Sequence, residues 1–310
     1  MPVESKPKPL VKWTGSKRQL ESTLISVFGQ SGWEKENNAY FEPFFGGGTM
    51  FFALEPLKAR VSDLNPALIE LYKAIKVSLL DFTRSASALQ DEYNSLDPTE
   101  QRKLFLKVKE QFNLNKTSFL ERSPSKKVDL ELALNLLFLN KTGFNGMYRE
   151  NGSGFYNIPF GQRRKIKLVD LENFELVCSS LMNVDPVCGD YHQILEGEAV
   201  SAGDLVYFDP PYSPAGESIT FTSYHRSGFN THDHLALADR ARALVAKGAK
   251  VVISNSHNAR MAEEYMERGL QVYEVEVNRL ISGKSHGRGI VKEILATSFS
   301  VDGLSLFGNR

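Results

Sequence analysis

The pattern of apolar and polar residues predicts alternating strands and helices in the first and last thirds of the chain. Short apolar runs bounded by turn residues are typical of buried strands, and apolar residues at helical spacing follow them. The pattern predicts an α/β fold, with a mostly parallel, doubly wound sheet, helices on both faces and ligands at the strand carboxyl ends. The predicted strands are residues 40–44, 59–62, 205–208, 250–253, 271–277 and 293–300, and the predicted helices 66–76, 232–246 and 259–268.

The middle of the chain follows another pattern. Residues 129–139 have the apolar face of a helix, and a loop rich in glycine, asparagine and basic residues follows. We therefore predict an inserted, mostly helical subdomain at residues 78–168. Residues 1–77 and 169–310 would then form the main domain, and a chain of 310 residues is long enough for both.

Composition is that of an ordinary globular protein, with 42% hydrophobic and 24% charged residues. The sequence shows no apolar run near the roughly 20 residues that span a bilayer, and its polar start does not resemble a secretory signal. A cytoplasmic location is expected. Cys178 and Cys188 lack metal-ligand spacing, so we expect two buried thiols and no metal site.

Charge is balanced overall but not locally. The chain has 37 basic and 37 acidic residues, yet residues 101–170 hold 14 of the basic residues against six acidic ones. A further basic cluster lies in residues 279–292. Such patches fit a surface that faces nucleic-acid phosphates, although a solvated helix face is the better explanation of any single cluster.

The four residues Asp209-Pro210-Pro211-Tyr212 follow the apolar run 205–208. An acid, two prolines and an aromatic ring at a strand end form a rigid polar notch beside a flat surface. Such a notch suits a planar base held by its amino group. A proline-bearing turn that only stops a strand is the alternative.

A second motif lies where the first predicted strand gives way to a helix. Gly46-Gly47-Gly48 allows backbone to approach a ligand closely, and Asp63 ends the next strand, where a carboxylate accepts hydrogen bonds from ribose. The dinucleotide fingerprint is excluded because Phe51 takes the place of its last glycine. A P-loop ending at residues 283–285 is excluded because Asn278 takes the place of its first glycine. A cofactor with adenosine and carboxylate ends but no phosphate, such as S-adenosylmethionine, fits these residues.

With these motifs in view, the chain resembles the Dam family of DNA adenine methyltransferases, in the motif order of the alpha group of amino-methyltransferases. The resemblance covers most of the chain and rests on residues 12–17, 42–48, 62–65 and 209–212. It implies a Rossmann-like class I methyltransferase sheet with an inserted target-recognition subdomain. It also implies that Asp209, Pro210, Pro211 and Tyr212 are catalytic, and that S-adenosylmethionine is bound by Trp13, Lys17, Glu42, Phe44, Gly46, Gly48, Asp63 and Asp209.

The middle segment resembles the part of the family that reads double-stranded DNA, over residues 139–149 and 155–161. The resemblance implies recognition of GATC, with Arg149 suited to a bidentate contact with guanine. Arg163 departs from the family, which has an aromatic contact to a flanking base there. The implied DNA-binding residues are Lys12, Phe144, Asn145, Met147, Arg149, Asn157, Pro159 and Arg163.

The expected reaction is methylation of the exocyclic amino group of an adenine flipped out of duplex DNA. Asp209 and the carbonyl group of Pro210 would accept its two N–H bonds, and Tyr212 would stack on the base. Methylation of a cytosine amino group, a catalytically inactive DNA-binding relative and a structured-RNA substrate remain open alternatives. We also expect that a cognate restriction endonuclease can share the target without direct contact.

Overall fold

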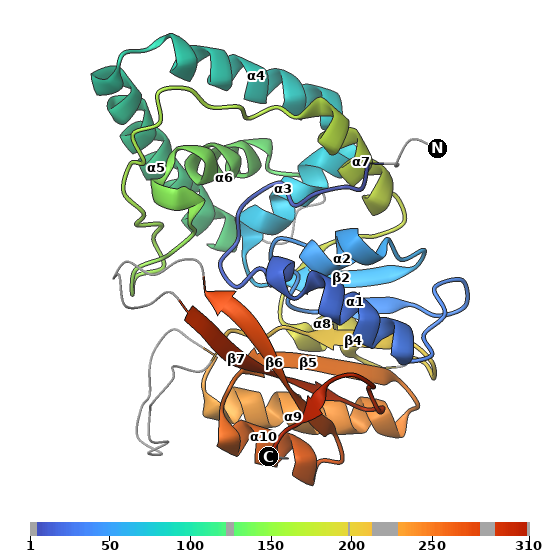
Figure 1. Ribbon diagram of the computed structural model, residues 1–310. Helices are drawn as coiled ribbons and strands as arrows, with labels where there is room; N and C mark the ends of the chain where they lie inside the picture. Colours follow the sequence, from blue (N-terminus) through green and yellow to red (C-terminus); the bar gives the residue numbers. More distant parts are fainter. Residues whose placement is uncertain (1–4, 122–126, 198, 213–228, 280–288, 309–310) are drawn as a thin grey trace. The chain divides into compact units, whose positions relative to one another are not determined.

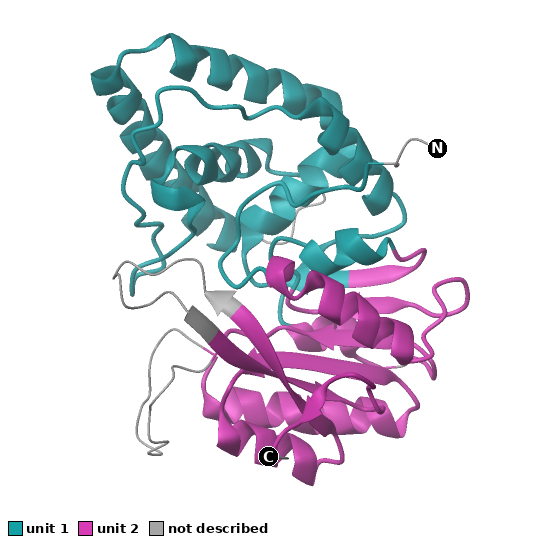
Figure 2. Ribbon diagram, viewed as in Figure 1, with its two compact units in different colours: residues 1–16, 45–55, 61–190 teal, residues 17–44, 56–60, 191–310 magenta. Residues whose placement is uncertain are grey.

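The computed structural model describes residues 5–121, 127–197, 199–212, 229–279 and 289–308 (Figure 1). The chain divides into two compact units, which Figure 2 shows in two colours. Unit 1 contains residues 1–16, 45–55 and 61–190, and unit 2 contains residues 17–44, 56–60 and 191–310.

Unit 2 contains a sheet whose strands run in the order β1-β4-β5-β7-β6-β8. The pairs β1/β4 and β4/β5 are parallel, whereas β5/β7, β6/β7 and β6/β8 are antiparallel. The strands are β1 (Tyr40–Glu42), β4 (Leu205–Phe208), β5 (Lys250–Ser256), β6 (Gln271–Arg279), β7 (Gly289–Thr297) and β8 (Ser305–Leu306).

The antiparallel half of this sheet differs from the mostly parallel sheet that the sequence predicts. Only the nine residues 280–288 join β6 to β7. A parallel crossover needs a dozen residues or more, so strands joined by so short a connection pair antiparallel. The strand segments themselves lie where the sequence predicts them, within a few residues at each end.

The helices of unit 2 cover its sheet. Figure 1 shows α9 and α10 on one side of the strands and α1 on the other. Asn230 begins α9 with a capping box, because its side chain accepts from the backbone of Asp233 and the Asp233 side chain accepts from the Asn230 backbone. The helices are η1 (Lys17–Gln19), α1 (Glu21–Gln30), α8 (Tyr191–Leu195), α9 (Thr231–Ala246) and α10 (Ala259–Glu267).

Unit 1 is mostly helical, and α6 (Leu130–Thr142) is its buried centre. Strand β2 (Ala59–Asp63), whose last three residues belong to this unit, pairs in parallel with β3 (Val187–Cys188). The side chain of Asn65 caps α3, and Pro66 takes the first helical position, where its missing N–H costs nothing. The other helices are α2 (Thr49–Leu54), α3 (Pro66–Val77), α4 (Leu79–Ser95), α5 (Pro98–Glu121), η2 (Phe144–Gly146) and α7 (Leu171–Leu181).

The prediction of a mixed α/β, Rossmann-like chain with a mostly helical middle part is confirmed. The two compact units have other boundaries than the predicted main domain and insertion, because unit 1 joins residues 78–168 to the glycine segment 45–55. Compactness does not test a division by function, which stays a prediction. Cys178 and Cys188 are free but only half-buried, since both lie at the margins of the core. Among the described helices, none has the length and apolar character needed to cross a membrane.

Candidate active site

Asp209 lies directly after β4, whose four residues are all buried. Its Oδ1 atom accepts hydrogen bonds from the ammonium group of Lys17 at 2.6 Å and from the hydroxyl group of Ser254 at 2.9 Å. Lys17 is 6% exposed and the Asp209 side chain 18% exposed, so the ion pair is largely withdrawn from water. The two prolines that follow fix φ and give the turn a rigid backbone.

Ser254, on β5, connects Asp209 to a buried tyrosine. The hydroxyl groups of Ser254 and Tyr207 lie 2.9 Å apart. Since a carboxylate only accepts, Ser254 donates its one proton to Asp209, and Tyr207 must donate to Ser254. Burial raises the pKa of Tyr207 well above its usual value, which keeps that proton in place. The order of donation is therefore Tyr207, Ser254, Asp209.

Tyr212 presents its ring beside the same carboxylate. The Lys17 ammonium group lies 4.7 Å from the ring centroid, within the range of a cation–π contact. The Tyr212 hydroxyl group donates to Glu293 on β7 at 2.5 Å. Burial, then the charges of Asp209 and Glu293, raise the pKa of Tyr212, so the phenol remains a donor.

Two more residues predicted to bind the cofactor belong to unit 2. Glu42 is buried and accepts a hydrogen bond from the hydroxyl group of Tyr40 at 2.9 Å. Phe44 is half-buried among the aromatic rings of Tyr191, Phe208 and Phe229. Phe44 thus contributes to an apolar wall beside the end of β4.

The remaining predicted cofactor residues belong to unit 1, where Asp63 ends β2. Its two carboxylate oxygens accept from the backbone N–H groups of Gly46 and Asn65, both at 2.8 Å. Burial raises the pKa of Asp63, while these two N–H groups act to lower it. Each oxygen keeps a lone pair, so Asp63 can still accept from a ligand hydroxyl group.

Trp13 lies against the glycine segment. Gly46 has a positive φ of 49°, and a Cβ atom placed on it would meet the Trp13 indole at 3.0 Å. Gly48 has a φ of 70°, and a Cβ atom there would lie 2.8 Å from the rings of Phe45 and Phe52. Only glycine fits both positions, and the indole ring covers the backbone closely.

The predicted DNA-binding residues gather in pairs within unit 1. The side chain of Asn140 holds the backbone of Lys12 and the carbonyl group of Gly146, which brings Lys12 to the η2 turn. The backbone N–H of Phe144 donates to the carbonyl group of Pro159 at 2.9 Å. The Arg149 guanidinium group donates to the Asn157 side chain at 2.8 Å.

Arg163 belongs to a group of like charges near this loop. Burial lowers the pKa of Lys141, and repulsion from Lys12 and Arg163 lowers it further. Neighbouring cations of this kind are relieved by an anion such as a phosphate group. The structure thus brings Lys12 and Arg163 into one electrostatic group with the half-buried Lys141.

Comparison with known proteins assigns the family. A family model described as D12 class N6 adenine-specific DNA methyltransferase matches residues 13–281, which is most of the chain. The chain belongs to this family. It is an adenine-specific DNA methyltransferase. This assignment favours neither of the two alternatives, a cytosine methyltransferase and a catalytically inactive relative.

The relatives named below match this methyltransferase over most of its length. It is 35% identical to the type II methyltransferase M.MjaIII of Methanocaldococcus jannaschii, over 91% of this chain and 95% of that protein. It is 33% identical to the type II methyltransferase M1.LlaDCHI of Lactococcus lactis subsp. cremoris, over 94% and 95%. It is 27% identical to the DNA adenine methylase of Escherichia coli K12, over 94% and 95%.

Sequence reasoning missed three residues of the methyltransferase that hold Asp209 and Tyr212. Ser254 and Glu293 lie on β5 and β7, and the pairing register of the strands brings them to the motif. Tyr207 lies on β4, two residues before Asp209, and acts through Ser254. Part of the predicted basic loop, residues 280–288, lies outside the described residues. Within the described ranges, no group of three His, Cys, Asp or Glu side chains is arranged to hold a metal ion.

Proposed function

We propose that this methyltransferase transfers a methyl group from S-adenosylmethionine to the exocyclic N6 amino group of an adenine flipped out of duplex DNA, within GATC. The observation that carries the proposal is the setting of Asp209. Lys17 and Ser254 both contact its Oδ1 atom, and Tyr212 lies beside it. Within the described residues, these contacts hold the carboxylate through Oδ1, so we propose that Oδ2 accepts from an amino group.

In the proposed reaction, Asp209 and the carbonyl group of Pro210 accept the two N–H bonds of the adenine amino group. These bonds draw the nitrogen toward tetrahedral geometry and localise its lone pair. When bound, S-adenosylmethionine supplies a methyl group activated by a positive sulfonium centre. The protein contributes positioning and electrostatic stabilisation. The nitrogen loses one proton after methylation, and Asp209 is the acceptor already hydrogen-bonded to it.

The cofactor residues fit an adenosine with a carboxylate end. Asp63 is fixed by two backbone N–H groups and has lone pairs for ribose hydroxyl groups. Gly46 and Gly48 bring backbone close to a ligand, and Trp13 and Phe44 offer aromatic surface. We propose that Glu42 and Lys17 complete this set, and that Lys17 also orients Asp209.

For DNA, we propose that Arg149 reads guanine, with Asn157 fixing the plane of its guanidinium group. A bidentate contact of this kind contributes about 1–3 kcal/mol of discrimination. Phe144 is 49% exposed, which suits a ring that supports the opened duplex. Lys12, Asn145, Met147 and Pro159 would contact the remaining bases, and Arg163 would contact a flanking position or phosphate.

The test is transfer of labelled methyl from S-adenosylmethionine to paired duplexes, one with GATC and one with its adenine replaced. Nucleoside digestion should give N6-methyladenine from the GATC duplex alone. Asp209→Asn should abolish transfer while cofactor binding persists. Methylation of other duplexes but not GATC would contradict the target proposal, and transfer to RNA alone would contradict the substrate.

A biological role follows from the relatives rather than from the structure. Two of them carry the name type II methyltransferase. We propose that a restriction endonuclease of the same specificity can accompany this enzyme without direct contact. Cleavage protection of host DNA in cells that express the enzyme would test this role.

A further inference from the structure

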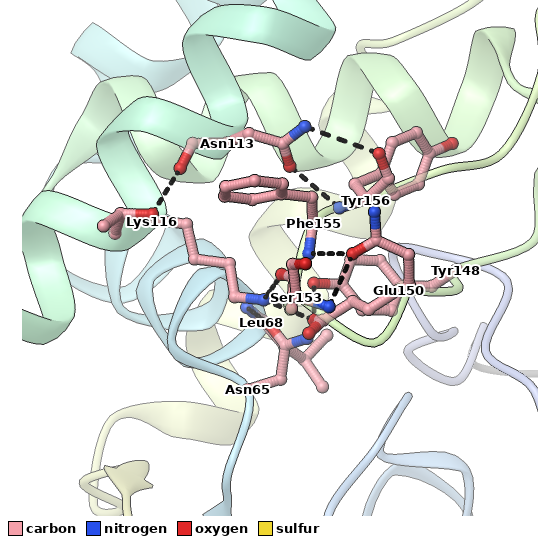
Figure 3. Close-up of polar contacts among 12 residues, drawn as sticks. Asn65, Leu68, Asn113, Lys116, Tyr148, Glu150, Ser153, Phe155 and Tyr156 are labelled. Atoms are coloured by element: carbon pink, nitrogen blue, oxygen red, sulfur yellow. Dashed lines mark hydrogen bonds and ion pairs between the residues drawn. The ribbon is translucent and has the colours of Figure 1, made fainter. Parts of the chain in front are cut away.

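Tyr148 lies within the base-contacting segment, between Met147 and Arg149, yet its side chain contacts the proposed cofactor segments. Its ring stacks on the indole of Trp13, with centroids 4.9 Å apart and an interplanar angle of 21°. Its hydroxyl group donates to Glu150 at 2.5 Å (Figure 3). The side chain of Asn65 interacts with the same hydroxyl group and acts to lower its pKa, while burial raises it. All of these residues belong to unit 1.

Both contacts lead to the proposed cofactor residues. Trp13 covers the backbone of Gly46, where a Cβ atom would already be 3.0 Å from the indole. Asn65 is bonded through its own backbone N–H to Asp63, which also holds the N–H of Gly46. Tyr148 is therefore linked through its ring to the glycine segment and through its hydroxyl group to the Asp63 turn.

The opposite side of Tyr148 is held rigidly by α5. Lys116 is only 7% exposed, and its ammonium group contacts Glu150 at 2.5 Å and the carbonyl group of Gly154 at 2.8 Å (Figure 3). Asn113 binds the backbone N–H of Tyr156 at 2.8 Å. Shifting this loop away from α5 would leave the buried Lys116 ammonium group without these two acceptors, which costs free energy. Movement of Met147 or Arg149 on binding bases is thus transmitted to Trp13 and Asn65.

We propose that Tyr148 is a positioning residue that couples duplex recognition to cofactor affinity in this enzyme. Contact of Met147 and Arg149 with the target sequence fixes Tyr148, which holds Trp13 on the glycine segment and Asn65 on the Asp63 turn. Coupling of this kind is reciprocal, so the cofactor also favours the target duplex over other DNA. The inference rests on the proposed function, since it needs the cofactor at Trp13, Gly46 and Asp63 and the target bases at Met147 and Arg149.

The experiment measures the dissociation constant of S-adenosylhomocysteine, an unreactive probe, without DNA, with a GATC duplex and with a scrambled duplex. For the wild-type enzyme we expect the GATC duplex to tighten binding about tenfold, within the usual range of coupling between two sites. Tyr148→Leu removes the stack and the hydroxyl group, and should bring the ratio close to one. Tyr148→Phe keeps the stack and should give an intermediate ratio.

A neighbouring tyrosine provides the matched control. Tyr156 lies in the same loop, and its hydroxyl group donates to the Leu139 carbonyl group at 3.3 Å. Tyr156→Phe should keep the wild-type ratio. A second readout is the emission of Trp13 in a Trp33→Phe background, which leaves it the sole tryptophan. GATC duplex should change this emission in the wild-type sequence and not in Tyr148→Leu.

The outcomes separate this inference from the proposed function. A full coupling ratio in Tyr148→Leu, or in Tyr148→Phe should the leucine variant not fold, would overturn the inference and leave the function intact. A wild-type ratio of one would do the same. An equal loss in Tyr156→Phe would show general loosening of the loop and also overturn it. Failure of the wild-type enzyme to bind the probe or any DNA would instead overturn the proposed function, and this inference with it.

Discussion

The two units use the same three residue types in two different ways. In unit 2, Lys17 pairs with Asp209 beside Tyr212, and in unit 1, Lys116 pairs with Glu150 beside Tyr148. The lysines are 6% and 7% exposed, and the N–O distances are 2.6 and 2.5 Å. Burial and ion pairing alone therefore do not distinguish the catalytic candidate from a structural contact.

The difference lies in the partner of each tyrosine hydroxyl group. The Tyr148 hydroxyl group donates to Glu150, the carboxylate that also pairs with Lys116. Glu150 therefore accepts hydrogen bonds from both the lysine and the tyrosine. The Tyr212 hydroxyl group donates instead to Glu293, and Asp209 accepts a hydrogen bond from the hydroxyl group of Ser254. In unit 2 the aromatic ring is fixed independently of the carboxylate. In both networks the two donors meet one carboxylate oxygen, Oδ1 of Asp209 and Oε1 of Glu150, so the networks differ in the partner of the tyrosine and not in the number of oxygens used.

Replacing each lysine by methionine should separate the two networks most clearly. Removing one partner of a buried ion pair costs about 3–5 kcal/mol, because the remaining charge is left uncompensated. Lys116→Met should lower the free energy of unfolding by this amount and leave single-turnover methylation measurable. Lys17→Met should lose most of its turnover, and its loss of stability should be no smaller than that of Lys116→Met, since the Asp209 side chain is 18% exposed and the Glu150 side chain 29% exposed.

Urea unfolding and single-turnover methylation measure the two effects. Lys103→Met is the control, because that lysine is 67% exposed and pairs with Glu100 at the surface. It should leave the free energy of unfolding close to the wild-type value. Equal losses of turnover in Lys17→Met and Lys116→Met would remove the distinction between the networks.

Acid should weaken unit 2 through His234, which is fully buried in the first turn of α9. Burial lowers the pKa of His234 to about 4 from an ordinary value of 6.5. Between pH 6.5 and 4 the unfolded chain binds a proton that the folded chain does not, so stability falls as the pH falls. The slope is about 1.4 kcal/mol per pH unit, and the full loss is about 3 kcal/mol.

The measurement is the free energy of unfolding at pH 7, 6, 5 and 4.5 for the wild-type enzyme and His234→Gln. The variant should lack this part of the pH dependence. His232→Gln is the matched control, since His232 is exposed two residues earlier in the same helical turn. A wild-type slope in His234→Gln would show that other groups cause the acid sensitivity.

Ser254 tests whether the hydrogen bonds around Asp209 serve the chemical step. Hydrogen bonds to a charged group contribute about 1.5–3 kcal/mol, so Ser254→Ala should lower kcat by about 10- to 100-fold. KM for DNA should change little, because Ser254 is buried and its hydroxyl group contacts Asp209 rather than DNA. Ser254→Thr keeps the hydroxyl group and should restore most of kcat. A raised KM with unchanged kcat would assign Ser254 to binding instead.

Local sequence patterns predicted much of the fold and many residues of the candidate site. The apolar run of β4 followed by Asp209 and two prolines, the glycine segment and the Asn65-Pro66 helix start all lie where the sequence predicts them. Each depends on residues that are neighbours in the chain. A strand end, a positive φ and a helix cap are determined over a few residues, so the sequence reveals them.

The partners across strands and loops were not predictable in the same way. Ser254 and Glu293 reach the site because β5 pairs with β4 in parallel and with β7 antiparallel, in one particular register. A shift by one residue would turn both side chains to the other face. The stack of Trp13 on Tyr148 joins segments more than 130 residues apart. Such contacts depend on tertiary packing, and no local pattern specifies them.

The smallest effect is expected where Tyr212 meets Glu293, and it tests the feature that separates the two networks. Tyr212→Phe keeps the ring for stacking and loses only the hydrogen bond to Glu293, which does not accept from the amino group in the proposed reaction, so kcat/KM should fall less than in Ser254→Ala. Glu293→Gln keeps a neutral acceptor for the phenol and should lose less. In unit 1, by contrast, Tyr148→Phe removes a donor from the carboxylate itself and should affect stability more than turnover. If Tyr212→Phe destabilised the fold and left kcat/KM unchanged, Glu293 would serve only packing, and the two tyrosines would play the same structural part.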